Sequence, residues 1–239
     1  MKRRPRKTPG AMASLLAIAA LACSAAAQTV IDETSAAFRA RVTLAPEVAA
    51  EPGLAGFLRE EAEETVALYR DIAREEARRV SVEITDRLTI LTPDYASVLR
   101  AMSIREGAAQ TELLETLTTD RRTGQFLRLD AFLGGPDGRR VLNDLAETLA
   151  QEIARQGHGG SPSERWASVI RAATRPDLTV LQNFTLRPDG TGSTRIGAIV
   201  FHFAPGAVAP PQVGPIAVAI PAAQLRPGLK PGIASRFAR

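Results

Sequence analysis

Apolar and polar residues largely alternate in two segments of the chain, residues 37–44 and 80–90. Successive side chains of a β-strand point to opposite faces, so this alternation predicts two half-buried strands. Thr92-Pro93-Asp94 interrupts the second pattern and predicts a turn. Shorter apolar patterns predict two more strands, over residues 95–104 and 110–119.

A different spacing covers residues 54–79, where apolar residues recur at intervals of three and four with charged residues between them. This pattern predicts one long amphipathic helix with a single buried stripe and a solvated charged face. The same spacing predicts a second helix from about Asp137 to Gly157 and a third, short helix from Ser161 to Arg175. Glycine and proline at these ends favour termination there.

The rest of the chain is rich in predicted strands, over residues 178–186, 194–203 and 216–220. Runs of strands with helices inserted between them are typical of an α+β protein, whereas regular alternation of strand and helix indicates a parallel sheet. We therefore predict an α+β fold: a mainly antiparallel sheet, one long helix in the N-terminal half and two further helices packed on the sheet. The 212 residues after residue 27 are enough for one domain or two closely packed halves.

The first 27 residues predict a cleavable signal peptide of the Sec type. Five lysine and arginine residues and no acid occupy positions 1–7, an apolar stretch of about 13 residues follows, and Ala25-Ala26-Ala27 offers a cleavage site. A helix that spans a bilayer needs roughly 20 apolar residues, so this stretch is short for a permanent anchor. We predict cleavage near Ala27 and a periplasmic or secreted product without a membrane span.

Two other interpretations of this leader stay open. Lipidation at Cys23 is one, although Leu21 stands one place later than in usual bacterial lipoprotein signals. Twin-arginine export through Arg3-Arg4 is the other, although Pro5-Arg6-Lys7 follows where that signal has apolar residues.

Removal of the leader changes the charge and the redox chemistry of the protein. The formal charge of the whole chain is +4, and five of its positive charges belong to the leader, which leaves −1 for the product. The positive net charge of the whole chain is therefore no evidence for a nucleic-acid partner, and we expect none. Cys23, the single cysteine, also leaves with the leader, so the product has no disulfide, thiol nucleophile or thiolate metal site.

Residue types and motifs that are typical of catalysis or metal binding are few in this chain. The two histidines, His158 and His202, match no metal-binding spacing, and no catalytic serine or phosphate-loop motif is present. We expect no metal, no cofactor and no catalytic residue. His158 lies between glycines in a predicted loop that is open to a ligand, and His202 lies on a strand face opposite Phe201 and Phe203. The alternatives to a ligand role are solvation of His158 and hydrogen bonding of His202 within its sheet.

The order of several short motifs along the chain gives an indication of the family that the chain resembles. Gly107-Ala108-Ala109-Gln110 ends one predicted strand, Thr123-Gly124 makes a turn, and Leu127-Arg128-Leu129-Asp130 leads toward a helix. Further on, Phe201-His202-Phe203 precedes Val218-Ala219-Ile220-Pro221. In this order the motifs resemble the extracytoplasmic domain shared by RsiV-type anti-sigma factors and PdaC-type peptidoglycan deacetylases (the RsiV-like domain), whose function is unassigned.

This resemblance covers roughly residues 36–230. It implies an N-terminal half over residues 28–104, an RsiV-like half over residues 105–230 and a tail over residues 231–239. The family has histidine where this chain has Gln110, which makes Gln110 the third candidate for ligand binding, beside His158 and His202. The resemblance also implies a cell-wall glycan such as peptidoglycan, or a lysozyme-like protein, as a partner, and another protein of the envelope is the alternative.

Three hypotheses of function follow from these observations. The first is an exported, non-enzymatic binding or accessory protein of the bacterial cell envelope, whose ligand is a cell-wall glycan or a protein. The second is an extracytoplasmic hydrolase that acts on glycan or peptide, which requires His202 and an Asp or Glu to converge in one pocket. The third is a purely structural envelope protein with a large exposed apolar patch.

Overall fold

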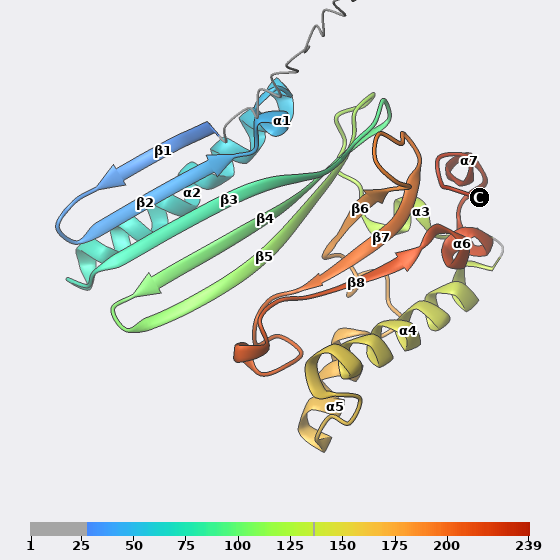
Figure 1. Cartoon of the computed structure of the whole chain (residues 1–239). Helices are drawn as coiled ribbons and strands as arrows, with labels where there is room; N and C mark the ends of the chain where they lie inside the picture. The colour runs from blue at the N-terminus through green and yellow to red at the C-terminus, as the bar shows by residue number, and fades with distance from the viewer. Residues whose placement is uncertain (1–27, 136) are drawn as a thin grey trace, which may run out of the picture.

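The computed structural model describes residues 28–135 and 137–239 as an α+β protein with two sheets (Figure 1). The predicted leader, with its cleavage site and Cys23, lies outside the described residues. The larger sheet has the strand order β1-β2-β3-β4-β5, and the smaller one has the order β6-β7-β8. The predicted α+β class is confirmed, and its strands are divided between two sheets.

The larger sheet is mainly antiparallel, as predicted. Its strands are β1 (Gln28–Thr34), β2 (Phe38–Leu44), β3 (Val80–Leu91), β4 (Tyr95–Glu106) and β5 (Ala109–Asp120). Only β2 and β3 pair in parallel, with Phe38 opposite Val80. Parallel neighbours need a crossover connection, and helix α2 (Pro52–Glu75) supplies it. The strand, helix and strand of this unit were predicted, but the parallel pairing of β2 with β3 and the edge strand β1 were not.

The predicted long helix, α2, covers one face of the larger sheet (Figure 1). Ala62 and Val66 of α2 pack there with Val42, Val82 and Ile84 in one core. Most of the charged residues of α2 lie on its other side and are exposed. The helix is therefore amphipathic in the way that its spacing of apolar residues predicted.

Strand β3 changes face part-way along its length. Its pairing with β4 shifts between Leu88 and Ile90, which is a β-bulge. Leu88 packs against the core near the start of α2, whereas Ile90 belongs to the core of the smaller sheet. The bulge therefore allows one strand to contribute side chains to both cores.

The smaller sheet is antiparallel and carries its own helices. Its strands are β6 (Phe184–Pro188), β7 (Ile196–Phe203) and β8 (Ile216–Pro221). Helix α4 (Gly138–His158) packs on this sheet, and α5 (Glu164–Ala173) packs against α4 (Figure 1). Strand β6 also contacts β3, β4 and β5, so it forms the junction between the sheets.

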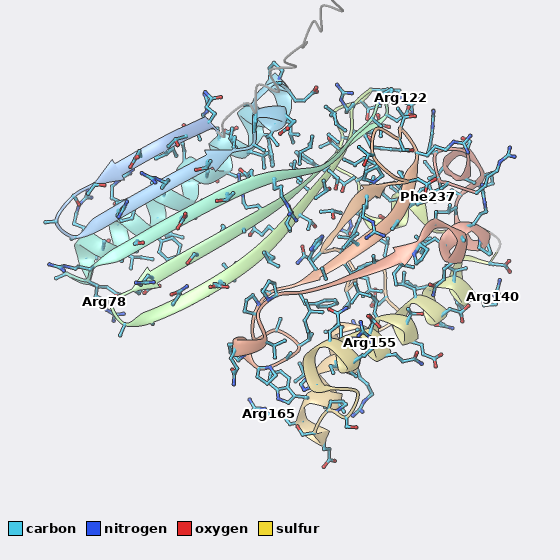
Figure 2. All side chains as sticks on the ribbon, viewed as in Figure 1. Arg78, Arg122, Arg140, Arg155, Arg165 and Phe237 are labelled. Carbon is cyan, nitrogen blue, oxygen red and sulfur yellow. The ribbon has the colours of Figure 1, made fainter. Side chains whose placement is uncertain are left out.

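The C-terminal residues 231–239 complete the core of the smaller sheet. Phe237 is fully buried and forms a bridge with Ile196 of β7, whereas Arg140 and Arg155 lie on the outside of α4 (Figure 2). Short helical segments connect the larger elements: α1 (Pro46–Ala49), α3 (Leu129–Phe132), η1 (Pro211–Val213), α6 (Ala222–Leu225), η2 (Arg226–Gly228) and α7 (Pro231–Ala234). Within the described ranges, no helix has both the length and the apolar character needed to cross a membrane.

Gly157 does not end α4, contrary to the prediction. The helix continues to His158, and Gly159 in the left-handed conformation (φ 59°) ends it. A Cβ atom at Gly157 would lie 2.7 Å from the Cβ of Ala209, in the loop before β8. This glycine therefore serves the close packing of helix against loop, a use that a local sequence pattern does not distinguish from helix termination.

Candidate functional site

The three predicted ligand-binding residues line none of the pockets described below. Gln110 is exposed near the start of β5, where its side-chain oxygen accepts a hydrogen bond from Arg105 at 3.0 Å. His158 lies in the last turn of α4 and not in the predicted loop, because the helix runs through Gly157. Its Nε2 is 3.0 Å from the carbonyl oxygen of Val208, and its ring packs against Trp166 at 5.4 Å between centroids.

His202 is buried in the smaller sheet, with 7% of its surface exposed. Its Nε2 lies 2.8 Å from the Thr185 hydroxyl on the neighbouring strand β6. Burial holds the pKa of His202 down, to about 4, and the positive charge of Arg87 acts in the same direction. No carboxylate among the described residues pairs with this ring, so the convergence that the hydrolase hypothesis requires is not found around His202.

A pocket of about 540 Å³ lies at the edge of β5. We call it the β5-edge pocket, and its lining residues come from α2, β4, β5 and the segment before β6: Leu58, Glu61, Val98, Arg100, Leu114, Glu115, Thr116, Leu117, Gln182 and Asn183. The register of the sheet places Glu115 directly opposite Arg100. Leu58 and Glu61 are one helical turn apart on α2, so both reach the same face of the sheet.

Arg100, which lines this pocket, forms a buried ion pair with Asp86. Arg100 Nε donates to Asp86 Oδ1 at 2.8 Å, and Nη2 donates to Asp86 Oδ2 at 2.9 Å and to the Leu58 carbonyl oxygen at 2.6 Å. The two side chains are 4% and 0% exposed. Burial opposes the charge on Arg100, but the hydrogen bonds and the attraction of Asp86 outweigh it and raise its pKa.

Two further carboxylates surround the guanidinium of Arg100. Glu61 Oε2 lies 3.5 Å from Arg100 Nη1. Burial raises the pKa of Glu61, and repulsion from Glu115 and Asp86 adds to this effect against the attraction of Arg100. One positive group thus faces three carboxylates, so the cluster has a formal charge of −2 when all are ionised. This excess of negative charge favours a ligand with a positively charged group.

The sequence contained a signal for this site. Val80, Val82 and Ile84 alternate on the buried face of β3, and the next residue in that series is Asp86. Arg100 likewise occupies a buried position between Val98 and Met102. Charged residues at buried positions of two predicted strands indicate either an ion pair or a site, and this pattern was not used in the prediction.

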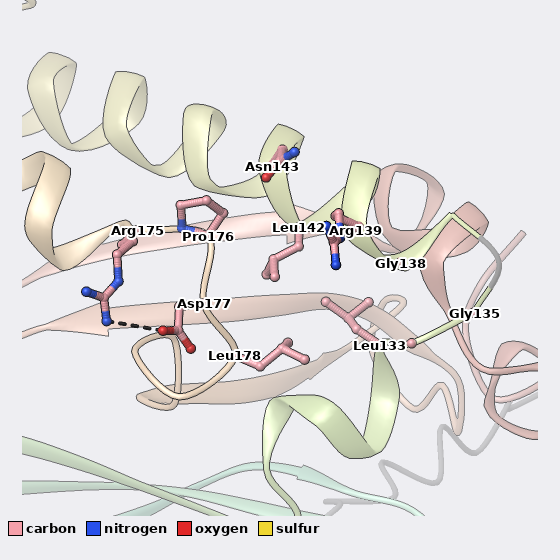
Figure 3. Close-up of a pocket in the computed structure, with 11 residues that line it drawn as sticks. Leu133, Gly135, Gly138, Arg139, Leu142, Asn143, Arg175, Pro176, Asp177 and Leu178 are labelled. Atoms are coloured by element: carbon pink, nitrogen blue, oxygen red, sulfur yellow. Dashed lines mark hydrogen bonds and ion pairs between the residues drawn. The ribbon is translucent and has the colours of Figure 1, made fainter.

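A larger pocket, of about 770 Å³, lies between α4 and the segment after α5 (Figure 3). Leu133, Leu142 and Leu178 contribute its apolar surface, and Arg175 pairs with Asp177 at 3.1 Å. This ion pair is exposed, and none of the lining side chains is both charged and buried. Exposed pairs of this kind have little energetic effect, so we place the candidate site at the β5-edge pocket.

Nothing in the described part of the chain forms a group of three or more His, Cys, Asp or Glu side chains able to hold a metal ion. The β5-edge pocket offers charged and amide side chains on an apolar base instead, which is the composition of a site for a small polar ligand.

Solved structures of other proteins share this fold, among them the following two. A DUF3298 family protein from Pseudomonas aeruginosa matches 90% of this chain and 94% of its own length, with a TM-score of 0.57 at 13% sequence identity. A DUF3298 family member from Bacteroides fragilis matches 88% of this chain and 95% of its own length, with a TM-score of 0.56 at 14% identity. The chain has a DUF3298-like fold. Identity this low shows the fold alone, and the name of that family denotes an uncharacterised domain.

A scan against protein-family models finds no match, and a search of curated proteins finds none either. The DUF3298-like fold agrees with the prediction that the chain is a domain of unassigned function. The link to RsiV-type and PdaC-type proteins stays a prediction.

Proposed function

We propose that the chain is an exported, non-enzymatic binding or accessory protein of the bacterial cell envelope. The β5-edge pocket carries this proposal, because it joins a concave shape to a buried ion pair and two partly exposed carboxylates. Its negative charge selects a ligand with a positively charged amine. A cell-wall fragment with a free amine in its peptide has such a group, and so does a basic side chain of an envelope protein.

The ion pair of Arg100 with Asp86 acts as a positioning device in this proposal. Buried ion pairs add little net stability compared with apolar packing of the same volume. Arg100, however, is held by three hydrogen bonds, and its free Nη1 faces Glu61. The guanidinium therefore holds the Glu61 carboxylate at the pocket, where it can accept hydrogen bonds from an ammonium group.

Replacement of both Glu61 and Glu115 by glutamine is expected to weaken binding at least tenfold. Each charge-assisted hydrogen bond contributes about 1.5–3 kcal/mol, and both substitutions keep the size of the side chain. Binding of the wild type and the variant to insoluble peptidoglycan and to lysozyme, measured by co-sedimentation and by calorimetry, checks this expectation.

The matched control is Glu60→Gln, which removes one charge from the exposed face of the same helix and should leave binding unchanged. The proposal fails if wild-type protein binds neither peptidoglycan nor lysozyme. It also fails if the double variant binds as well as the control.

Export is the second part of the proposal, and it depends on the pattern of residues 1–27. Expressed with its own leader in a bacterium, the protein is expected in the periplasm or the medium with its N-terminus near Gln28. Intact-mass measurement of the recovered protein checks this. A cytoplasmic product that keeps Met1 would contradict export, and a product that starts at Cys23 with added lipid would support the lipoprotein interpretation.

A further inference from the structure

A third pocket, of about 560 Å³, lies between the start of α2 and the turn that follows β5. We call it the aromatic pocket because Phe57 and Phe126 meet there, with ring centroids 4.4 Å apart and ring planes inclined by 48°. Leu54, Pro52 and Pro93 extend this apolar surface. The aromatic pocket shares no lining residue with the β5-edge pocket.

Phe126 is unusual among the aromatic side chains of this chain because 50% of its surface is exposed. Burial of a phenylalanine side chain stabilises a fold, so a half-exposed ring forgoes part of that stabilisation. Gly124, in the same turn, and Gly53, at the start of α2, have no atom within 4 Å of the place where a Cβ would stand. Both glycines line the same pocket as the Phe126 ring, and the absence of a side chain at each keeps the pocket open there.

Polar groups are fixed along another wall of the aromatic pocket. Arg121 Nη2 donates to both carboxylate oxygens of Glu51 at 2.9 Å, and Nη1 donates to the carbonyl oxygen of Thr92 at 2.6 Å. The side chains of Arg121 and Glu51 are 31% and 27% exposed. Asp120 lines the same pocket. A flat apolar surface therefore stands next to donors and acceptors whose positions are set by the protein.

We infer that the aromatic pocket binds a pyranose ring of a glycan. A pyranose presents a face of C–H groups, which packs on a flat aromatic ring, and an edge of hydroxyl groups, which both donate and accept hydrogen bonds. The half-exposed ring of Phe126 fits the first feature, and the Glu51–Arg121 pair with Asp120 fits the second. This site is independent of the amine site proposed above, because it is built from other residues.

The test uses the full exported chain and a soluble tetramer of β-1,4-linked N-acetylglucosamine, with a tetramer of α-1,4-linked glucose for comparison. Calorimetry or NMR titration measures the binding of each. Phe126→Leu keeps the apolar character and removes the flat ring, so we expect glycan binding roughly tenfold weaker. Phe126→Tyr keeps the ring and should bind within about twofold of the wild type.

The control variant is Leu68→Ala, since Leu68 is an exposed apolar residue of α2, 58% exposed, outside the pocket. It should bind glycan like the wild type. Absence of glycan binding by the wild type, or equal binding by Phe126→Leu, overturns the inference. Binding of a proline-rich peptide without binding of either glycan also overturns it, in favour of a peptide site.

Discussion

Replacement of Arg100 by methionine is expected to lower the free energy of unfolding by about 3–5 kcal/mol. Asp86 has no exposed side-chain surface, and Arg100 is the charged group that holds it, through two hydrogen bonds. Removal of the guanidinium leaves a buried carboxylate without a counter-charge and the Leu58 carbonyl without this donor. Equilibrium unfolding in urea, followed by circular dichroism, measures the loss.

Two further variants show whether burial is the reason for this loss. The double variant Asp86→Leu, Arg100→Met replaces the pair by apolar groups and should regain most of the lost stability. Arg74→Met breaks a surface pair with Asp71, whose side chains are 74% and 60% exposed, and should change the free energy of unfolding by less than about 1 kcal/mol. An Arg100→Met variant as stable as Arg74→Met would contradict this account of the ion pair.

Acidification from pH 6.5 to about 4 is expected to destabilise the wild type by about 3 kcal/mol more than a His202→Gln variant. The folded protein holds the pKa of His202 down to about 4, whereas the unfolded chain takes up a proton below about pH 6.5. In this window the unfolded state binds more protons, so stability is lost as the pH falls. Above pH 6.5 the contribution is fully present.

Free energies of unfolding, measured in urea at several values of pH, give the difference between the two proteins. Glutamine does not titrate in this range and can still bond to the Thr185 hydroxyl, so acidic groups elsewhere affect both proteins alike. Parallel stability curves for the wild type and His202→Gln would show that His202 is protonated equally in the folded and unfolded states, contrary to its burial.

The candidate sites differ in how far the sequence pointed to them. Gln110 was selected because the chain resembles the RsiV-like domain, which has histidine at this position. His158 and His202 were selected because of their residue type. The structure gives each a local role: a surface hydrogen bond, a contact at the end of α4 and a bond between neighbouring strands. The β5-edge pocket was missed, although Asp86 and Arg100 interrupt two buried apolar series.

Periodicity alone was sufficient for the three longest helices and for most strands of this protein. The alternation over residues 80–90 and the three- and four-residue spacing over residues 54–79 correspond to β3 and α2, because a side chain's direction depends only on local backbone geometry. Tertiary structure decided which elements meet. The bulge near Leu88 divides β3 between two cores, and the segment before β6 supplies Gln182 and Asn183 to the β5-edge pocket. Phe57 and Phe126 also meet only through packing. These contacts join residues far apart in the chain, and local periodicity contains no information about such partners.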